Sequence, residues 1–162
     1  MAELYKALPP FYASLHEGSE GPDVALAQSW LNGLREEWPA LPKLRVDGRY
    51  GSDTRHAVKI FQLANGLQED GVIGKNTWDM LYSRYAARHT EGEQYPGIVL
   101  RQGHKGAAVR SVQNQLKALV PALSADGRFG KKTEAAVLAW QASNGLTMDG
   151  VIGKNTWNSL YK

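Results

Sequence analysis

A nine-residue stretch, DGVIGKNTW, occurs twice in the chain, at 70–78 and again at 149–157. Its carboxylate, lysine, amide and hydroxyl groups are side chains that can bind an anion, hold a metal ion or take part in catalysis. Two related stretches, DGRYGSDT and DGRFGKKT, share with it the pattern Asp-Gly-x-apolar-Gly-x-x-Thr, which therefore occurs four times. Each copy directly precedes a predicted helix. The pattern raises three alternatives: a phosphate-binding loop, a metal-binding loop, or a turn that the fold needs four times.

The known ligand-binding loops do not fit this pattern. A phosphate-binding loop has the spacing Gly-x-x-x-x-Gly-Lys-Ser/Thr after a strand, whereas GVIGKNT is shorter and has Asn after the lysine. An EF-hand loop needs acidic ligands at alternate positions and a terminal Glu, but only one Asp recurs in all four stretches. The pattern instead predicts a tight turn: the Asp accepts backbone N–H bonds, glycine takes positive φ, and Thr lies in the first helical turn.

The remaining polar residues indicate no catalytic or metal site. There is no Gly-x-Ser-x-Gly elbow, and the repeated acids are turn residues rather than an acid pair across a cleft. We therefore expect no catalytic residue, no metal, no cofactor and no enzymatic activity of the chain by itself. The histidines lack HExxH or comparable metal-ligand spacing: His16, His56, His89 and His104.

Composition narrows the class of protein further. The 162 residues carry a formal net charge of +3 and no cysteine. Lysine and arginine are scattered rather than gathered in the stripe typical of nucleic-acid binding, so no nucleic-acid partner is expected. No apolar run approaches the roughly 18–20 residues that span a bilayer, so no membrane insertion is expected. The N-terminal stretch lacks the basic region and apolar core of a secretory signal, which leaves the route of any export open.

An internal repeat determines the organisation of the chain. Residues 47–82 match residues 126–161 at 22 of 36 positions with a constant offset of 79. Upstream of this match the offset is 85, so the first copy carries six extra residues in the loop within REEWPALPKLRV. Apolar spacing predicts three helices in each copy; in the first they begin after Gly21, near Ser52 and after Gly74. The predicted fold is all-α, with two tandem three-helix units joined by a short linker.

The predicted domain boundaries follow from the repeat. An N-terminal arm covers 1–14, the first repeat 15–88, a linker 89–97 and the second repeat 98–162. The linker is placed where SRYAARHTEGEQYPG changes from a helical pattern to one rich in Gly, Glu and Pro.

The whole pattern closely resembles the type 1 peptidoglycan-binding domain. The resemblance is carried by L-x-x-G-x-x-G-x-x-V-x-x-x-Q-x-x-L, D-G-x-F-G-x-x-T-x-x-A-V, an aromatic-Gln pair and G-L-x-x-D-G-x-x-G-x-x-T-W, which both copies contain. The first copy departs in having Tyr50 where Phe is usual and in its longer loop. The resemblance implies a three-helix module that holds bacterial cell wall non-covalently and commonly targets an amidase, muramidase, peptidase or spore-cortex lytic enzyme.

Three functions remain open at this stage. The favoured one is non-catalytic binding of cell-wall peptidoglycan through the two repeated modules. The second is the wall-targeting region of a larger cell-wall or spore-cortex lytic hydrolase. The third is the same scaffold diverted to bind a protein or to act as a pro-segment. The expected partners are peptidoglycan and a hydrolase domain, and the expected location is the cell wall or the cell exterior.

Polar and aromatic residues shared by both copies are the candidate ligand contacts. N-acetyl sugars favour aromatic faces and amide hydrogen bonds, whereas the carboxylates of peptide stems favour Arg, Lys or backbone N–H groups. The Lys-Asn pair lies at a helix N-terminus, which favours anions. For the glutamines, a structural role in tying loops together is an open alternative. The candidates are Arg49, Tyr50, Gln62, Lys75 and Asn76 in the first copy and Arg128, Phe129, Gln141, Lys154 and Asn155 in the second.

Overall fold

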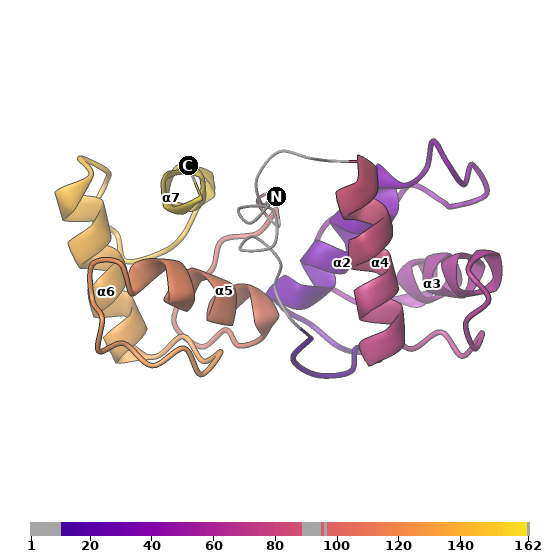
Figure 1. Cartoon of the computed structure of the whole chain (residues 1–162), viewed down its shortest axis with the longest axis horizontal. Helices are drawn as coiled ribbons and strands as arrows, with labels where there is room; N and C mark the ends of the chain where they lie inside the picture. Colours follow the sequence, from indigo (N-terminus) through magenta and orange to yellow (C-terminus); the bar gives the residue numbers. More distant parts are fainter. Residues whose placement is uncertain (1–10, 89–94, 96, 162) are drawn as a thin grey trace.

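The computed structural model describes residues 11–88, 95 and 97–161. Its helices form two groups of three, side by side along the long axis of the molecule (Figure 1). Among the described residues there is no strand, only isolated bridges. The prediction of an all-α fold with two three-helix units is thus confirmed. The helices are α2 (Pro22–Gly33), α3 (Ser52–Ala64) and α4 (Lys75–Arg88), then α5 (Ala107–Leu116), α6 (Lys131–Ser143) and α7 (Lys154–Leu160).

Local sequence accounts for where the helices begin and end. Pro22 occupies the first position of α2, where its missing N–H costs nothing. The α3 helix ends at Ala64. Its C-cap is Asn65, whose side-chain Nδ2 donates to the carbonyl of Phe61 (2.9 Å), and Gly66 follows with a φ of 68°. Most residues of the predicted linker, 89–94 and 96, and residues 1–10 of the predicted arm lie outside the described residues.

The inserted loop of the first repeat packs against the core of that repeat and does not extend into solvent. Trp38 is half-buried, and its ring packs edge-on against Phe61 of α3 at 5.8 Å between centroids. Trp30 of α2 likewise packs edge-on against Trp78 of α4 at 4.9 Å. The second repeat has Gln115 in place of Trp30, and Gln115 Nε2 donates to the carbonyl of Leu160 (2.8 Å). The two cores therefore differ at the contact between the first and last helices of each repeat.

An extended segment precedes each first helix and connects to both turns of its own repeat. Leu15 and Ile73 exchange two backbone hydrogen bonds (3.0 and 2.8 Å), as do Leu100 and Ile152 in the second repeat (3.0 and 2.8 Å). The sequence pattern did not predict these bridges, because a single bridged pair leaves no period-two alternation. They hold the Asp-Gly turns against the start of each repeat.

The two units meet where the N-terminus of α5 packs against the first turn of α2. Gly106, the residue before α5, has no side chain to cap the helix. Asp23 of α2 supplies the cap: its Oδ2 accepts the N–H of Ala107 (2.7 Å) and its Oδ1 accepts that of Ala108 (2.9 Å). A Cβ on Gly106 would lie 2.6 Å from Asp23 Oδ2, so this position requires glycine. One carboxylate thus joins the two repeats.

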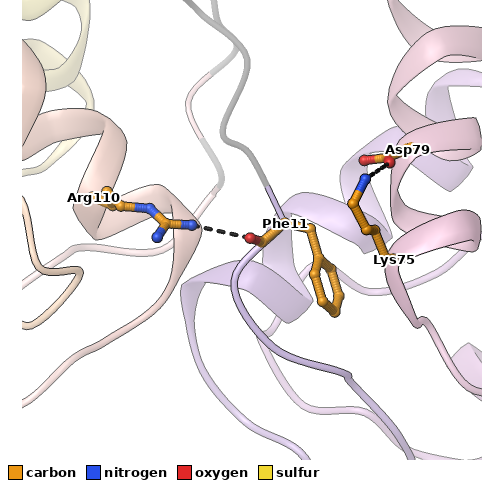
Figure 2. Close-up of polar contacts among 4 residues, drawn as sticks. All are labelled: Phe11, Lys75, Asp79 and Arg110. Atoms are coloured by element: carbon orange, nitrogen blue, oxygen red, sulfur yellow. Dashed lines mark hydrogen bonds and ion pairs between the residues drawn. The ribbon is translucent and has the colours of Figure 1, made fainter.

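The segment leading into each repeat packs on a turn of the other repeat. Gly127 lies against the ring of Tyr12, which leaves no room for a Cβ, and a Cβ on Gly48 would lie 3.2 Å from Ile98 Cδ1. Arg110 of α5 also crosses the junction, since its guanidinium donates to the carbonyl of Phe11 (3.0 Å), as Figure 2 shows. These reciprocal contacts fix the orientation of one repeat relative to the other.

The stability of the chain should depend on pH through Asp23. Burial raises the pKa of Asp23 from 3.8 to about 6, against the opposing effects of the Ala108 and Ala107 N–H bonds and of Arg110. A raised folded-state pKa adds stability that is complete below pH 3.8 and is lost as the pH rises through about 6. From pH 7 to pH 5, the free energy of unfolding of the wild type should rise by about 1 kcal/mol relative to that of Asp23→Asn. Urea unfolding at both pH values measures this difference.

Comparing the wild type with Asp23→Asn cancels the stability contributions of groups that titrate in both proteins. His104 is one of them, because burial and the charge of Arg101 lower its pKa. The pKa values of Asp47 and Asp126 are lowered, first by the N–H bonds of Arg49 and Arg128, so their contributions are lost only as the pH falls below 3.8. Parallel pH profiles for wild type and Asp23→Asn would contradict the assignment of Asp23 as a buried, ionisable cap.

Candidate functional site

A buried glutamine holds each Asp-Gly turn in the same way. In the last turn, the two N–H groups of Gln141 Nε2 are shared among three acceptors: Asp149 Oδ1 (2.9 Å), the carbonyl of Val151 (2.9 Å) and Thr156 Oγ1 (3.1 Å). The N–H of Gly150 donates to Gln141 Oε1 (3.0 Å). One side-chain amide thus satisfies the Asp, the Thr and the backbone of the turn. Corresponding bonds are made by Gln28 in turn 47–54, by Gln62 in turn 70–77 and by Gln113 in turn 126–133.

The turn interpretation of the repeated stretch agrees with this geometry, with one difference. Asp149 Oδ1 also accepts the N–H of Val151 two residues on (3.1 Å), as expected of a turn-forming Asp. The Thr hydroxyl, however, bonds to the glutamine instead of capping the helix. The residue that caps α3, α6 and α7 is in each case a glycine with no side-chain cap bond: Gly51, Gly130 and Gly153.

Four of the ten candidate ligand residues lie in the core. Tyr50 and Phe129 are each 2% exposed, and Gln62 and Gln141 are each 1% exposed. The hydroxyl of Tyr50 donates to the carbonyl of Gly71 (2.6 Å), and burial raises its pKa above the ordinary value. A large ligand cannot reach these side chains without opening the repeat. Their contacts support the turns from the side of the core.

The other six candidates are exposed and fall into two groups. Arg49 and Arg128 lie within the first turn of their repeats and form bridges with Glu20 and Lys105 through the backbone. The second group begins the last helix of each repeat and consists of Lys75 and Asn76 on α4 and Lys154 and Asn155 on α7.

The structure brings Lys154 and Asn155 together with a cavity in the second repeat. The cavity has a volume of about 480 Å³ and both polar and apolar walls. An ammonium, a carboxylate, hydroxyls and aliphatic side chains in one hollow can hold a peptide-like or amide-bearing ligand. Its lining residues are Val99, Gly145, Leu146, Thr147, Asp149, Val151, Gly153, Lys154, Asn155 and Thr156.

Long-range pairing and a helix end assemble this cavity. The hydrogen bonds between Leu100 and Ile152 bring Val99 beside the turn that precedes α7. The N–H of Leu146 donates to the carbonyl of Gln141 (2.9 Å), which folds the end of α6 toward the same turn. Sequence reasoning missed Val99, Leu146 and Thr147 as site residues, because they belong to no chemical motif. The only available signal was the Gly-Leu pair that follows the second helix in both repeats.

Further features bear on the kind of site present. Within the described ranges, no group of three His, Asp or Glu side chains is arranged to hold a metal ion. No helix in the same part of the chain is long and apolar enough to cross a membrane.

Comparisons with known proteins find one family twice in the chain. The model of the peptidoglycan binding domain family matches residues 20–81 and again residues 105–160. These two ranges cover the two three-helix units, except for the last residues of α4, and contain all four glutamine-held turns.

Several curated relatives are named as amidases, and one is named as a carboxypeptidase. N-acetylmuramoyl-L-alanine amidase CwlL of Bacillus licheniformis is 36% identical over 88% of the chain and 43% of its own length. A probable N-acetylmuramoyl-L-alanine amidase of the same organism is 36% identical over 72% of the chain and 36% of its own length. Zinc D-Ala-D-Ala carboxypeptidase of Streptomyces albus G is 38% identical over 39% of the chain and 26% of the enzyme. The chain thus spans less than half the length of these relatives.

Replacing Gln141 with Leu should lower the free energy of unfolding by about 3 kcal/mol, because buried groups of the turn lose their hydrogen-bond partner. Gln62→Leu should cost a similar amount, since Gln62 makes the corresponding bonds in the first repeat. Gln102→Leu replaces an exposed glutamine and should change stability by less than about 0.5 kcal/mol. Urea unfolding followed by circular dichroism measures all three, and equal effects of the buried and exposed substitutions would contradict the assigned role.

Proposed function

Because the chain belongs to the family of peptidoglycan binding domains, we propose that it binds bacterial cell-wall peptidoglycan through both repeats without cleaving it. The observation that carries this proposal is the family match to each three-helix unit, at 20–81 and 105–160. Two modules held in a fixed relation raise the overall affinity for a polymer beyond that of either one. The modules are taken as residues 15–88 and 98–162.

The exposed members of the candidate set are the proposed ligand contacts. Arg49 and Arg128 are cations with fork-shaped donors, which suit the carboxylates of peptide stems. The Lys-Asn pairs at 75–76 and 154–155 offer an ammonium and an amide, and the second pair lines the cavity of about 480 Å³. The buried candidates, Tyr50, Phe129, Gln62 and Gln141, support these surfaces from the core.

We further propose that the chain serves as the wall-holding part of a cell-wall hydrolase system, at the cell wall outside the membrane. In support, the relatives named above as amidases are 36% identical to the chain, which spans 36% and 43% of their lengths. A non-catalytic module that keeps a hydrolase at its insoluble substrate raises the local substrate concentration.

The purified chain should sediment saturably with peptidoglycan sacculi stripped of teichoic acids. Binding should persist at an ionic strength of about 0.5 M, because contacts made at close range are screened less than diffuse attraction. Loss of all pelleting under this condition would reject wall recognition. Saturable capture of a protein from extract, with no binding to sacculi, would favour the diverted interaction module instead.

Removing both arginines should identify their contribution to wall binding. Arg49→Ala combined with Arg128→Ala should weaken binding about fivefold, since each substitution removes a charge-assisted contact. The matched control is Lys43→Ala with Lys132→Ala, which removes the same charge from other exposed positions of the two repeats. Equal losses of binding in the two double variants would show that the arginines act only through the net charge of the chain.

The chain alone should leave a suspension of purified cell wall at constant turbidity over hours. Addition of a wall amidase provides the positive control for the same suspension. Clearing by the purified chain that disappears on a single carboxylate substitution, such as Asp149→Asn, would overturn the non-catalytic assignment.

A further inference from the structure

The two copies of DGVIGKNTW are identical, yet their lysines have different surroundings. In the first repeat, Lys75 Nζ lies 2.6 Å from Asp79 Oδ2, one helical turn further along α4, as Figure 2 shows. In the second repeat the residue at this position is Asn158. Among the described residues no ion pair of Lys154 is found. The charge of one lysine is therefore balanced within its own helix, and the charge of the other is not.

This difference falls at the edge of the cavity in the second repeat. Lys154 lines the cavity together with the aliphatic side chains of Val99, Leu146 and Val151. Asp149 and Thr147 provide acceptors and a hydroxyl on the same walls. The walls thus combine a cation for a carboxylate, acceptors for amide N–H groups and an apolar surface for small aliphatic side chains.

We propose that the two repeats are not equivalent in wall binding: the cavity of the second repeat binds a carboxylate-bearing segment of the peptide stem through Lys154. At the corresponding position of the first repeat, Asp79 competes with the stem for Lys75, so this lysine contributes less to binding than Lys154 does. This inference rests on the proposed function and assigns to one of the two Lys-Asn pairs the larger share of the contact with a stem carboxylate. The chemical match favours a peptide stem over a neutral sugar, since a neutral ligand gives the ammonium no counter-charge.

Exchanging one residue between the repeats tests the inference. Asn158→Asp gives Lys154 the same partner that Lys75 has, and should weaken binding to sacculi about threefold. Part of this effect comes from competition for the ammonium and part from repulsion of the stem carboxylate. Asp79→Asn removes the partner of Lys75. This change should leave binding unchanged or strengthen it by no more than about twofold. Both positions are exposed, so neither change disturbs the core.

A matched control separates the local effect from net charge. Asn114→Asp makes the same charge change at an exposed position of α5 outside the cavity lining, and should bind as the wild type does. A second readout uses sacculi whose stem carboxylates have been converted to amides with carbodiimide and ammonia. On these sacculi wild type and Asn158→Asp should bind equally, because the group that the ammonium recognises has been removed.

The outcomes separate this inference from the function on which it rests. Failure of the wild type to pellet with untreated sacculi rejects the proposed function and the inference with it. Normal pelleting of the wild type with an unchanged affinity of Asn158→Asp, or with equal losses in Asn158→Asp and Asn114→Asp, rejects the inference alone. A loss confined to Asn158→Asp, and abolished by amidation of the sacculi, supports the inference.

Discussion

The hydrogen bonds of one buried glutamine side chain are the interaction on which each turn of this protein depends. An amide of this kind can donate twice and accept twice, and a buried polar group left unpaired costs about 1–3 kcal/mol. Gln141 uses this capacity to join a helix to the Asp, the backbone and the Thr of the following turn. The arrangement recurs with Gln28, Gln62 and Gln113, which explains why Asp, Gly and Thr recur at fixed spacing in all four stretches.

A different interaction decides how the repeats are joined. Asp23 has no counterpart in the second repeat, where the matching position is Ala108, one of the residues whose N–H it accepts. Near this cap, the lack of a side chain at Gly48 and Gly127 leaves room for the segment that leads into the opposite repeat to pack against each turn. The exchange of contacts is nearly reciprocal and leaves little freedom between the units. Both repeats therefore present their surfaces in one fixed relation, which suits a ligand that is itself a repeating polymer.

Similarity of sequence between the repeats extends to the scaffold more than to the surface. The turns, the glutamines and the buried Trp78 and Trp157 are shared, because the same core has to be built twice. Differences occur at a few buried positions, such as Trp30 and Asp23, and also where packing does not impose a residue, as at Asp79 and Asn158 on the exposed side of the last helix. Duplication gives two scaffolds, and small polar exchanges can then direct one of them to a particular part of the ligand.

The sequence by itself determined the fold class, the two repeats, the helix starts at Pro22 and Ser52, and the structural character of the Asp-Gly turns. These features depend on apolar periodicity and on local turn chemistry, which neighbouring residues specify. Only the tertiary structure decided which candidates are accessible: it buried Gln62 and Gln141, left the arginines exposed, and assembled a cavity from residues as far apart as Val99 and Lys154. It also decided that Asp23 caps a helix of the other repeat. Burial and contacts between distant segments arise only when the helices pack, so no local pattern could have specified them.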